Sequence, residues 1–218
     1  MARTVPLAPP AARSGVLAAA VVLLGGCAGS TGIGEDPVDP GRPLPKSVPA
    51  AIGPVTTRPP TTPLVLDDGS GATVCLGAVR GSAPPACSVD PVPLEGWAWP
   101  RGGSPTERDG VRWGRYALTG TFDGTTLAVT GSVPAALYDT VRPDPVTLPP
   151  PGTPFNDDAL DGIAKEVRGL PGALDVTRDD AGHVLVDVVH DDGTLQAWAD
   201  QRYSAGVVVL TGALVPPA

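Results

Sequence analysis

Apolar and polar side chains alternate most regularly along residues 111–133, on both sides of an Asp123-Gly124 pair. Asp-Gly is typical of a two-residue type I′ hairpin turn, which would place Phe122 opposite Thr125. This register collects large apolar side chains on one face and hydroxyl-bearing side chains on the other, as in a half-buried antiparallel pair. The sequence therefore predicts a hairpin whose core face consists of Tyr116, Leu118, Phe122, Leu127, Val129 and Val133.

Two shorter apolar runs, at residues 63–66 and 72–76, flank a turn signal at 67–69 and predict a second hairpin. The segment after Cys75 contains Gly81 and Pro84-Pro85, which argue against regular structure there. These runs and the hairpin at 111–133 predict an antiparallel β region over residues 63–135, with ordered structure beginning near Leu64.

The hydrophobic period changes after residue 155. Apolar positions from Leu160 to Leu170 recur at helical spacing, Asn156 is a candidate N-cap and Pro171-Gly172 is a stop signal. The remaining pattern predicts strands at 173–177 and 183–189, a short helix at 194–203 and a strand at 207–210. Residues 155–216 should therefore form a small α-β-β-α-β layer. Because such a layer is near the lower size limit for independent folding, we expect it to pack on the β region.

Proline-rich stretches separate these regions. The chain has 28 Pro and 28 Gly among 218 residues, so part of it is expected to be unstructured linker. Residues 27–62 are predicted to be an extended tether, at about 3.1 Å per residue, and residues 136–154 a second linker.

Residues 1–26 have the layout of a secretory signal peptide, with Arg3 and Arg13 before an apolar run at 16–24. The run is too short to span a bilayer as a helix. The sequence Leu24-Gly25-Gly26-Cys27 resembles a bacterial lipobox, which implies cleavage after Gly26, thioether lipidation of Cys27 and acylation of the new amino terminus by a fatty acid such as palmitate. The alternative is an ordinary signal peptide that contains a cysteine. A lipid anchor would hold the chain on the extracytoplasmic face of the cell membrane.

With Cys27 lipidated, Cys75 and Cys87 remain, and an even pair on an exported chain predicts a disulfide. Two buried free thiols are the alternative. A metal site is disfavoured because neither cysteine has a histidine or a second cysteine at ligand spacing, and no cofactor is expected. The predicted fold class is therefore α+β, with a disulfide-pinned β region followed by the α-β-β-α-β layer, after a signal peptide and a tether.

The charge balance argues against a nucleic-acid partner. Acidic residues number 23 against 15 basic ones, for a formal net charge of −8, and the chain has no basic run. The partners we expect are the membrane, through the lipid anchor, and an envelope protein or a cell-wall glycan.

Several motifs resemble a family of uncharacterised exported actinobacterial proteins, many of them lipoproteins. The resemblance covers most of residues 64–215, and it implies location and kinship of fold, with no known activity. Only the paired cysteines are carried over as functional residues. The motifs are Cys75-Leu76-Gly77-Ala78-Val79, Ser82-Ala83-Pro84-Pro85-Ala86-Cys87, Gly96-Trp97-Ala98-Trp99, Gly110-Val111-Arg112-Trp113-Gly114 and Arg202-Tyr203-Ser204-Ala205-Gly206-Val207-Val208, in which Ser204 stands where glycine is expected.

Three tryptophans are the candidate ligand-binding residues. The pattern places Trp97 and Trp99 on one side of a strand, and Trp113 on the polar face of the hairpin. They could stack on sugar rings or a peptide. Alternatively, they form core in a chain with few Phe and Tyr, and this is the interpretation that the composition favours.

No catalytic residue is identified. His183 and His190 are seven residues apart on opposite faces of one predicted strand, so they cannot share a metal and are expected at the surface or beside turns. The paired aspartates lack the alternating spacing of a calcium loop. We therefore expect a non-enzymatic protein with an envelope interaction or structural role. The alternative is a glycan- or small-ligand-binding module that uses the tryptophans.

Overall fold

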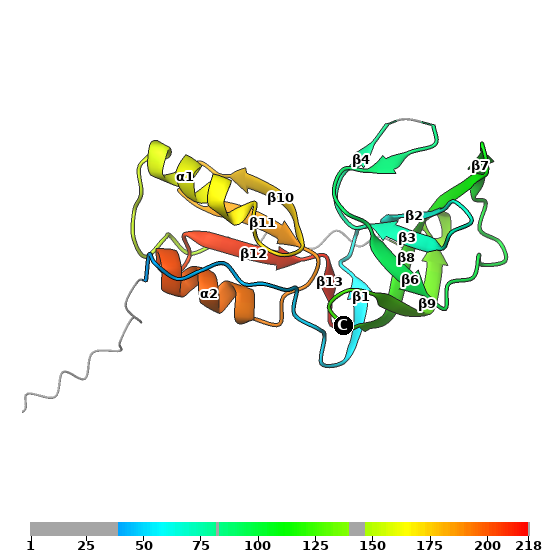
Figure 1. Cartoon of the computed structure of the whole chain (residues 1–218), viewed down its shortest axis with the longest axis horizontal. Helices are drawn as coiled ribbons and strands as arrows, with labels where there is room; N and C mark the ends of the chain where they lie inside the picture. The colour runs from blue at the N-terminus through cyan, green and yellow to red at the C-terminus, as the bar shows by residue number, and fades with distance from the viewer. Residues whose placement is uncertain (1–38, 82, 140–146, 218) are drawn as a thin grey trace, which may run out of the picture. The chain divides into compact units, whose positions relative to one another are not determined.

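The computed structural model describes residues 39–81, 83–139 and 147–217, which belong to one compact unit extending from Asp36 to Ala218. Cys27 and the predicted signal peptide lie outside the described residues. The first part of the unit is built from strands (Figure 1). They are β1 (Pro54–Thr57), β2 (Leu64–Asp67), β3 (Ala72–Cys75), β4 (Val79–Arg80), β5 (Ala86–Cys87), β6 (Val92–Glu95), β7 (Thr106–Arg108), β8 (Val111–Phe122) and β9 (Leu127–Pro134).

Five of these strands close into a ring. The strand β8 pairs with β2, β2 with β3 and β3 with β6, all antiparallel, and β9 lies between β6 and β8. Three consecutive strands followed by a fourth that returns beside the first are a Greek key. The OB-fold is a five-stranded Greek-key barrel of this general kind. Because β6 and β9 run parallel, the sheet is mixed and not purely antiparallel as predicted.

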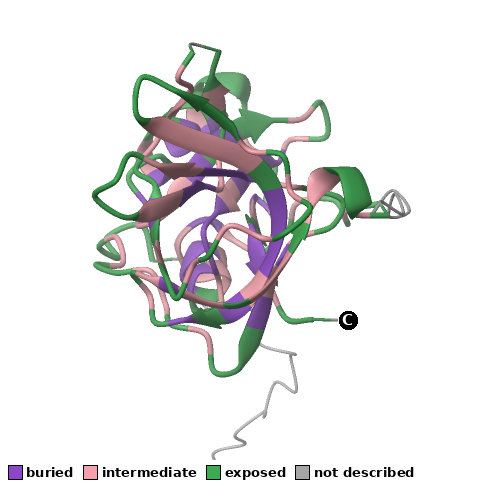
Figure 2. Ribbon diagram, turned by 90° about the vertical axis from the view of Figure 1, so that its right-hand side faces the viewer, coloured by how far each residue is buried: buried purple, intermediate pink, exposed green. Residues whose placement is uncertain are grey.

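Alternate strand side chains form the core of the barrel, and Figure 2 colours the ribbon by how far each residue is buried. Successive residues of a strand point to opposite faces, so one face of each strand lines the interior. The buried stretches drawn in purple follow the strands around the ring. The core residues of these five strands are Val65, Val74, Val92, Tyr116, Leu118, Phe122 and Leu127.

The long hairpin differs from its predicted register. Phe122 pairs with Leu127, so the turn spans four residues. The Asp123 carboxylate oxygen Oδ1 accepts the backbone N–H groups of Thr125 and Thr126, at 2.8 and 2.7 Å. A shift of two residues keeps the same side chains inward, and Tyr116, Leu118, Phe122 and Leu127 are buried as predicted. A bulge after Thr119 then changes the alternation. Consequently Val133, which lies after the bulge, is 40% exposed, and the prediction for Val133 is wrong. Val129, which lies before the bulge, is half-buried and packs against the barrel core.

The segment between the cysteines is a small hairpin in which β4 pairs with β5, with Val79 opposite Cys87. The prediction that it lacks regular structure is therefore wrong. The predicted disulfide between Cys75 and Cys87 is confirmed, with the two Cα atoms 5.2 Å apart.

The described part of the predicted tether contains ordered structure. Residues 54–57 form β1, which pairs with β8. Upstream of it, the Trp198 indole Nε1 donates to the Pro43 carbonyl at 2.8 Å, and the Arg202 guanidinium donates to the Arg42 carbonyl at 2.8 Å. Prolines lack the backbone N–H that a strand needs for pairing. This segment is therefore held by side-chain donors that bond its carbonyl groups. Ordered structure begins earlier in the chain than Leu64.

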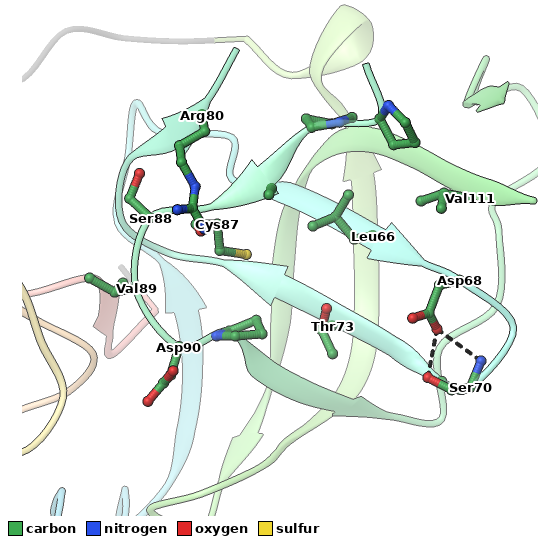
Figure 3. Close-up of a pocket in the computed structure, with 15 residues that line it drawn as sticks. Leu66, Asp68, Ser70, Thr73, Arg80, Cys87, Ser88, Val89, Asp90 and Val111 are labelled. Atoms are coloured by element: carbon green, nitrogen blue, oxygen red, sulfur yellow. Dashed lines mark hydrogen bonds between the residues drawn. The ribbon is translucent and has the colours of Figure 1, made fainter. Parts of the chain in front are cut away.

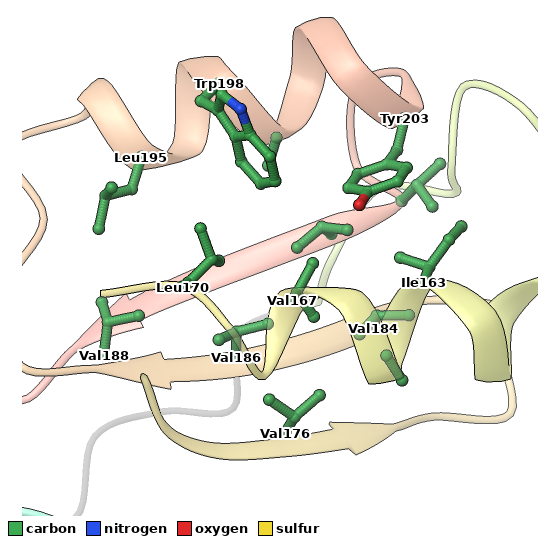
Figure 4. Close-up of a cluster of buried hydrophobic side chains, with 14 of the residues drawn as sticks. Ile163, Val167, Leu170, Val176, Val184, Val186, Val188, Leu195, Trp198 and Tyr203 are labelled. Carbon is green, nitrogen blue, oxygen red and sulfur yellow. The ribbon is translucent and has the colours of Figure 1, made fainter. Parts of the chain in front are cut away.

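The second part of the unit has the predicted order of elements, α1 (Asp157–Val167), β10 (Ala173–Arg178), β11 (Val184–Val188), α2 (Thr194–Tyr203) and β12 (Val208–Gly212). The side chain of Asn156 caps α1 by accepting the N–H of Ala159 at 2.9 Å. Strand β11 pairs antiparallel with β10 and parallel with β12. Both helices contribute to one core with this sheet (Figure 4), which includes Ile163, Val167, Val176, Val184, Val186, Val188, Leu195, Trp198 and Tyr203.

The two parts are joined by shared packing. A last strand, β13 (Leu214–Val215), pairs with β1 in the barrel sheet. Leu174 and Val189, from the α/β part, are members of the barrel core cluster. The Arg58 guanidinium also contacts the Asp187 carboxylate at 3.0 Å. The mixed sheets and the two α-helices of the described residues make the fold α+β.

Candidate functional site

A hollow of about 510 Å³ lies on the outer face of β2 and β3, beside the β4–β5 hairpin (Figure 3). Leu66 and Thr73 are cross-strand partners, so their side chains share this face. Val111 of β8 extends the floor, and Pro84 and Pro85 of the hairpin border it. The volume is within the roughly 300–1,000 Å³ range of small-ligand sites.

The disulfide positions the hairpin that borders this hollow. Cys75 stands opposite Leu64 on the outer face of the β2–β3 pair, and it is 2% exposed. Cys87, at the end of the hairpin, lines the hollow. The covalent bond between them therefore holds β5 against the face of the barrel. The two segments that flank the hairpin lie close together at its base. A Cβ added to Gly77 would lie 3.2 Å from a methyl group of Val89.

The charges around the hollow are predominantly acidic. Asp68 lies at the β2–β3 turn and Asp90 beyond the hairpin, and the basic group of the lining is Arg80. The Arg80 guanidinium donates to the Cys87 carbonyl at 2.9 Å. The Ser70 hydroxyl and backbone N–H donate to Asp68 Oδ1, at 2.6 and 2.9 Å, and these bonds lower the pKa of the Asp68 carboxyl. Asp68 is therefore ionised at neutral pH.

The described lining of the hollow is of mixed polarity. It combines apolar side chains with two carboxylates and the hydroxyl groups of Ser70, Thr73 and Ser88, and it contains no histidine. The two carboxylates, of Asp68 and Asp90, lie at the β2–β3 turn and beyond the hairpin. Within the described part of the chain, no group of three or more His, Cys, Asp or Glu side chains could hold a metal ion.

The tryptophans are divided between two faces. Trp97 and Trp99 follow β6 and pack edge to face, with ring centroids 5.3 Å apart, and both contact the Tyr116 ring, at 5.1 and 5.8 Å. They are half-buried against the barrel core. Trp113 is the cross-strand partner of Leu66. Strand alternation therefore places Trp113, like Val111, on the outer face of the barrel that Leu66 shares, opposite the face of Arg112.

Polar contacts fix one of the two paired tryptophans more firmly than the other. The Trp99 indole Nε1 donates to Asp67 Oδ2 at 3.3 Å, and the Arg112 guanidinium lies 5.6 Å from the Trp99 ring centroid. The Trp97 indole Nε1 is buried and has no hydrogen-bond partner among the described residues. The structure thus brings Trp97 and Trp99 together and leaves Trp113 apart from them.

The two histidines lie beside turns, one at each end of β11, as one of the two expected positions has it, but both are buried and not at the surface. The His183 ring is 2% exposed and lies between Asp179 and the Pro149 carbonyl. His190 is 4% exposed, and its Nδ1 lies 3.0 Å from the Leu214 carbonyl. Each ring therefore has a structural contact.

The residues that line the hollow were not identified from the sequence. Leu66, Thr73 and Val111 look like ordinary strand residues, and Asp68 and Asp90 like ordinary turn residues. The available signal was the predicted disulfide, which brings the loop after Cys75 back to β3. It did not show that the loop would form a hairpin that borders a hollow.

Comparisons with known proteins found no matching family model, no similar curated protein and no similar solved structure. Among the described residues, no helix is both long enough and apolar enough to cross a membrane. The function therefore has to be inferred from the residues and contacts of the chain itself.

Proposed function

We propose that the chain is a lipid-anchored protein of the extracytoplasmic face of the cell membrane, and that it binds a partner and has no catalytic role. The observation that carries the location is the Cys75–Cys87 disulfide. Disulfides form and persist in oxidising compartments, outside the cytoplasm. The lipobox-like sequence that ends at Cys27 adds an anchor to this location. The resemblance to exported actinobacterial lipoproteins points the same way.

The contacts of the titratable side chains support a non-catalytic role. The Arg80 guanidinium donates to the backbone carbonyl of Cys87. His183 and His190 both contact backbone carbonyls. A catalytic base should instead face a space that a substrate can enter.

Lipidation can be tested with the full-length chain expressed in a bacterium that processes lipoproteins. We expect a mature amino terminus at Cys27 that carries the mass of a diacylglyceryl group and an acyl chain. The protein should partition into the detergent phase of Triton X-114, and a protease added outside spheroplasts should cleave it. The Cys27→Ser variant should lose the lipid mass and the partitioning. An unmodified Cys27 thiol in the processed protein would refute the proposal.

A glycan- or small-ligand-binding module is the second candidate function. The buried Trp97 N–H without a partner among the described residues, next to the half-buried Trp99, is the observation that favours it. Acrylamide quenching and titration with cell-wall glycan fragments test this function in the wild type and in the Trp99→Phe and Trp113→Phe variants. Emission that is protected from acrylamide and unchanged by the glycans would exclude it.

A further inference from the structure

We propose that the hollow beside the β4–β5 hairpin binds a basic segment of a partner protein, with a Lys or Arg side chain of that segment lying in the hollow. This inference rests on the proposed function, because the partner must meet the anchored chain outside the cytoplasm. The site differs from the Trp97 and Trp99 pair, since neither tryptophan lines the hollow.

The shape of the lining suits a long aliphatic side chain with a charged end. Leu66 and Val111 form an apolar floor, with Pro84 and Pro85 beside it. Lys and Arg bury their methylene stems along such apolar surfaces while the charged group reaches a polar end. Trp113 pairs with Leu66 and so shares the face of the floor, but it is not among the described residues that line the hollow. The described lining offers carboxylates beside apolar side chains, a combination that suits a basic peptide.

The charges of the lining favour a cation. Asp68 lies at the turn end of the hollow and Asp90 at another part of its rim. Both bonds from Ser70 go to Oδ1 of Asp68, and no described residue bonds its Oδ2. The one guanidinium of the lining, that of Arg80, is engaged with the Cys87 carbonyl. The whole chain carries a net charge of −8, which would also attract a basic partner.

Binding should depend on the disulfide. The bond between Cys75 and Cys87 holds the hairpin against β3. Reduction would free the hairpin and remove one side of the hollow, whereas the barrel core consists of other residues. The oxidised protein should therefore bind a basic segment, and the reduced protein should not.

Titrations of the ¹⁵N-labelled full-length chain in detergent, followed by NMR, test the inference. The probes are the peptide Gly-Lys-Leu-Lys-Gly and its counterpart Gly-Glu-Leu-Glu-Gly, each added to millimolar concentration at low ionic strength. We expect the lysine peptide to shift the amide signals of Leu66, Thr73 and Ser88, and the glutamate peptide to shift none of them. Equal shifts with both peptides, shifts elsewhere only, or no shifts would overturn the inference.

Variants test the individual groups. Asp68→Asn and Asp90→Asn should each weaken binding at least fivefold, and Thr73→Arg, which places a cation in the floor, should abolish it. Asp158→Asn is the matched control, because Asp158 is exposed on α1. Mild reduction should abolish the shifts while the signals of core residues such as Leu118 keep their positions. An unchanged affinity in both aspartate variants would contradict the inference.

The outcomes of the two experiments are separable. Lipidation at Cys27 without binding of the lysine peptide would support the proposed location and refute the basic ligand. Binding of the peptide through Asp68 without lipidation would support the binding site and refute the lipid anchor.

Discussion

Nδ1 of His183 lies 2.7 Å from Oδ2 of Asp179, across the turn that joins β10 to β11. The other ring nitrogen lies 2.9 Å from the Pro149 carbonyl, in the segment that precedes α1. Both partners are acceptors, so the protonated imidazolium can donate to both of them. The buried ring therefore ties the segment around residue 149 to the sheet.

This arrangement shifts both pKa values. The Pro149 carbonyl and the Asp179 carboxylate raise the pKa of His183 against the opposing effect of burial. Burial alone would raise the pKa of Asp179, but the backbone N–H and the ring of His183 together lower it. The His183 contribution to stability is therefore complete below its unfolded pKa, about 6.5, and is lost as pH rises through the higher folded value. The Asp179 contribution is present above the ordinary aspartate pKa of 3.8 and is lost as pH falls through the lower folded pKa.

The first prediction is that the His183–Asp179 pair stabilises the fold most between about pH 4 and 6.5. At pH 5, His183→Asn should lower the free energy of unfolding by about 1.5–3 kcal/mol, the range for hydrogen bonds to charged groups. The loss should shrink at pH 9, because neutral imidazole can donate only one of its two bonds. Urea unfolding of both proteins from pH 3 to 9 measures this. If His183→Asn lowered the free energy of unfolding equally at pH 5 and pH 9, protonated His183 would not be the stabilising form.

A second prediction concerns the outer edge of β12. The side-chain amide of Gln196 donates to the Val208 carbonyl at 2.8 Å and accepts the N–H of Leu210 at 2.9 Å. It thus occupies backbone groups that a neighbouring strand would otherwise bond, and free strand edges promote association. Gln196→Ala should lower the free energy of unfolding by about 1–3 kcal/mol and should form dimers or larger species as its concentration rises.

Size-exclusion chromatography with light scattering measures that association. Gln201→Ala is the control on the same helix, because the backbone carbonyl of Gln201 accepts the N–H of Asp39 and the substitution leaves that group in place. If Gln196→Ala stays monomeric to the highest concentration at which the wild type does, the side chain has no protective role at the edge.

Local patterns predicted the elements of this fold better than its long-range pairings. Helical spacing from Leu160 onward and the N-cap at Asn156 are local signals, and α1 follows them closely. The ring closure requires β6 to pair with β9, some thirty residues later, and no local pattern encodes that contact. The proline content around β1 indicated an extended tether, so β1 was not predicted. Its pairing with β8 and the upstream contact with Trp198 come from distant parts of the chain.

The candidate site shows the same division. The pairing of Cys75 with Cys87 follows from cysteine count and export alone. The hollow depends on where the hairpin lies over Leu66 and Thr73, and this placement follows from the tertiary fold. The alternation of Trp97 and Trp99 suggested a strand, but β6 ends at Glu95 and both side chains pack on Tyr116. Here side-chain packing, and not strand period, fixes the positions of the rings.

A third prediction concerns the disulfide. Its two cysteines are 12 residues apart, and the chain-entropy model gives about 3 kcal/mol for a loop of this length. The double variant Cys75→Ser/Cys87→Ser should therefore unfold at lower urea concentration, with a loss of about 2–4 kcal/mol. Far-UV circular dichroism should show a retained β signal. If stability were equal in the oxidised wild type and the double variant, the disulfide would contribute nothing to the free energy of unfolding.

The last prediction tests the observed hairpin register. A Cβ added at Gly120 would lie 2.2 Å from the carbonyl oxygen of Ala128, a backbone atom that cannot move without disturbing the β8–β9 pairing. Overpacking in a well-packed region costs about 1–3 kcal/mol and occasionally more. We expect Gly120→Ala to lower the free energy of unfolding by about 3 kcal/mol, measured by urea titration with far-UV circular dichroism.

Gly131→Ala provides the matched control in the same hairpin. A Cβ at Gly131 would meet nothing nearer than 3.7 Å, which is an ordinary van der Waals contact. Its effect should therefore be below about 1 kcal/mol, because the substitution removes only the extra freedom of glycine in the unfolded chain. In the register with a two-residue turn, Gly120 would face Leu127 across the pair instead of Val129. Similar unfolding midpoints for the two variants would contradict the bulged register, whereas a large difference between them requires the close approach of Gly120 to Ala128.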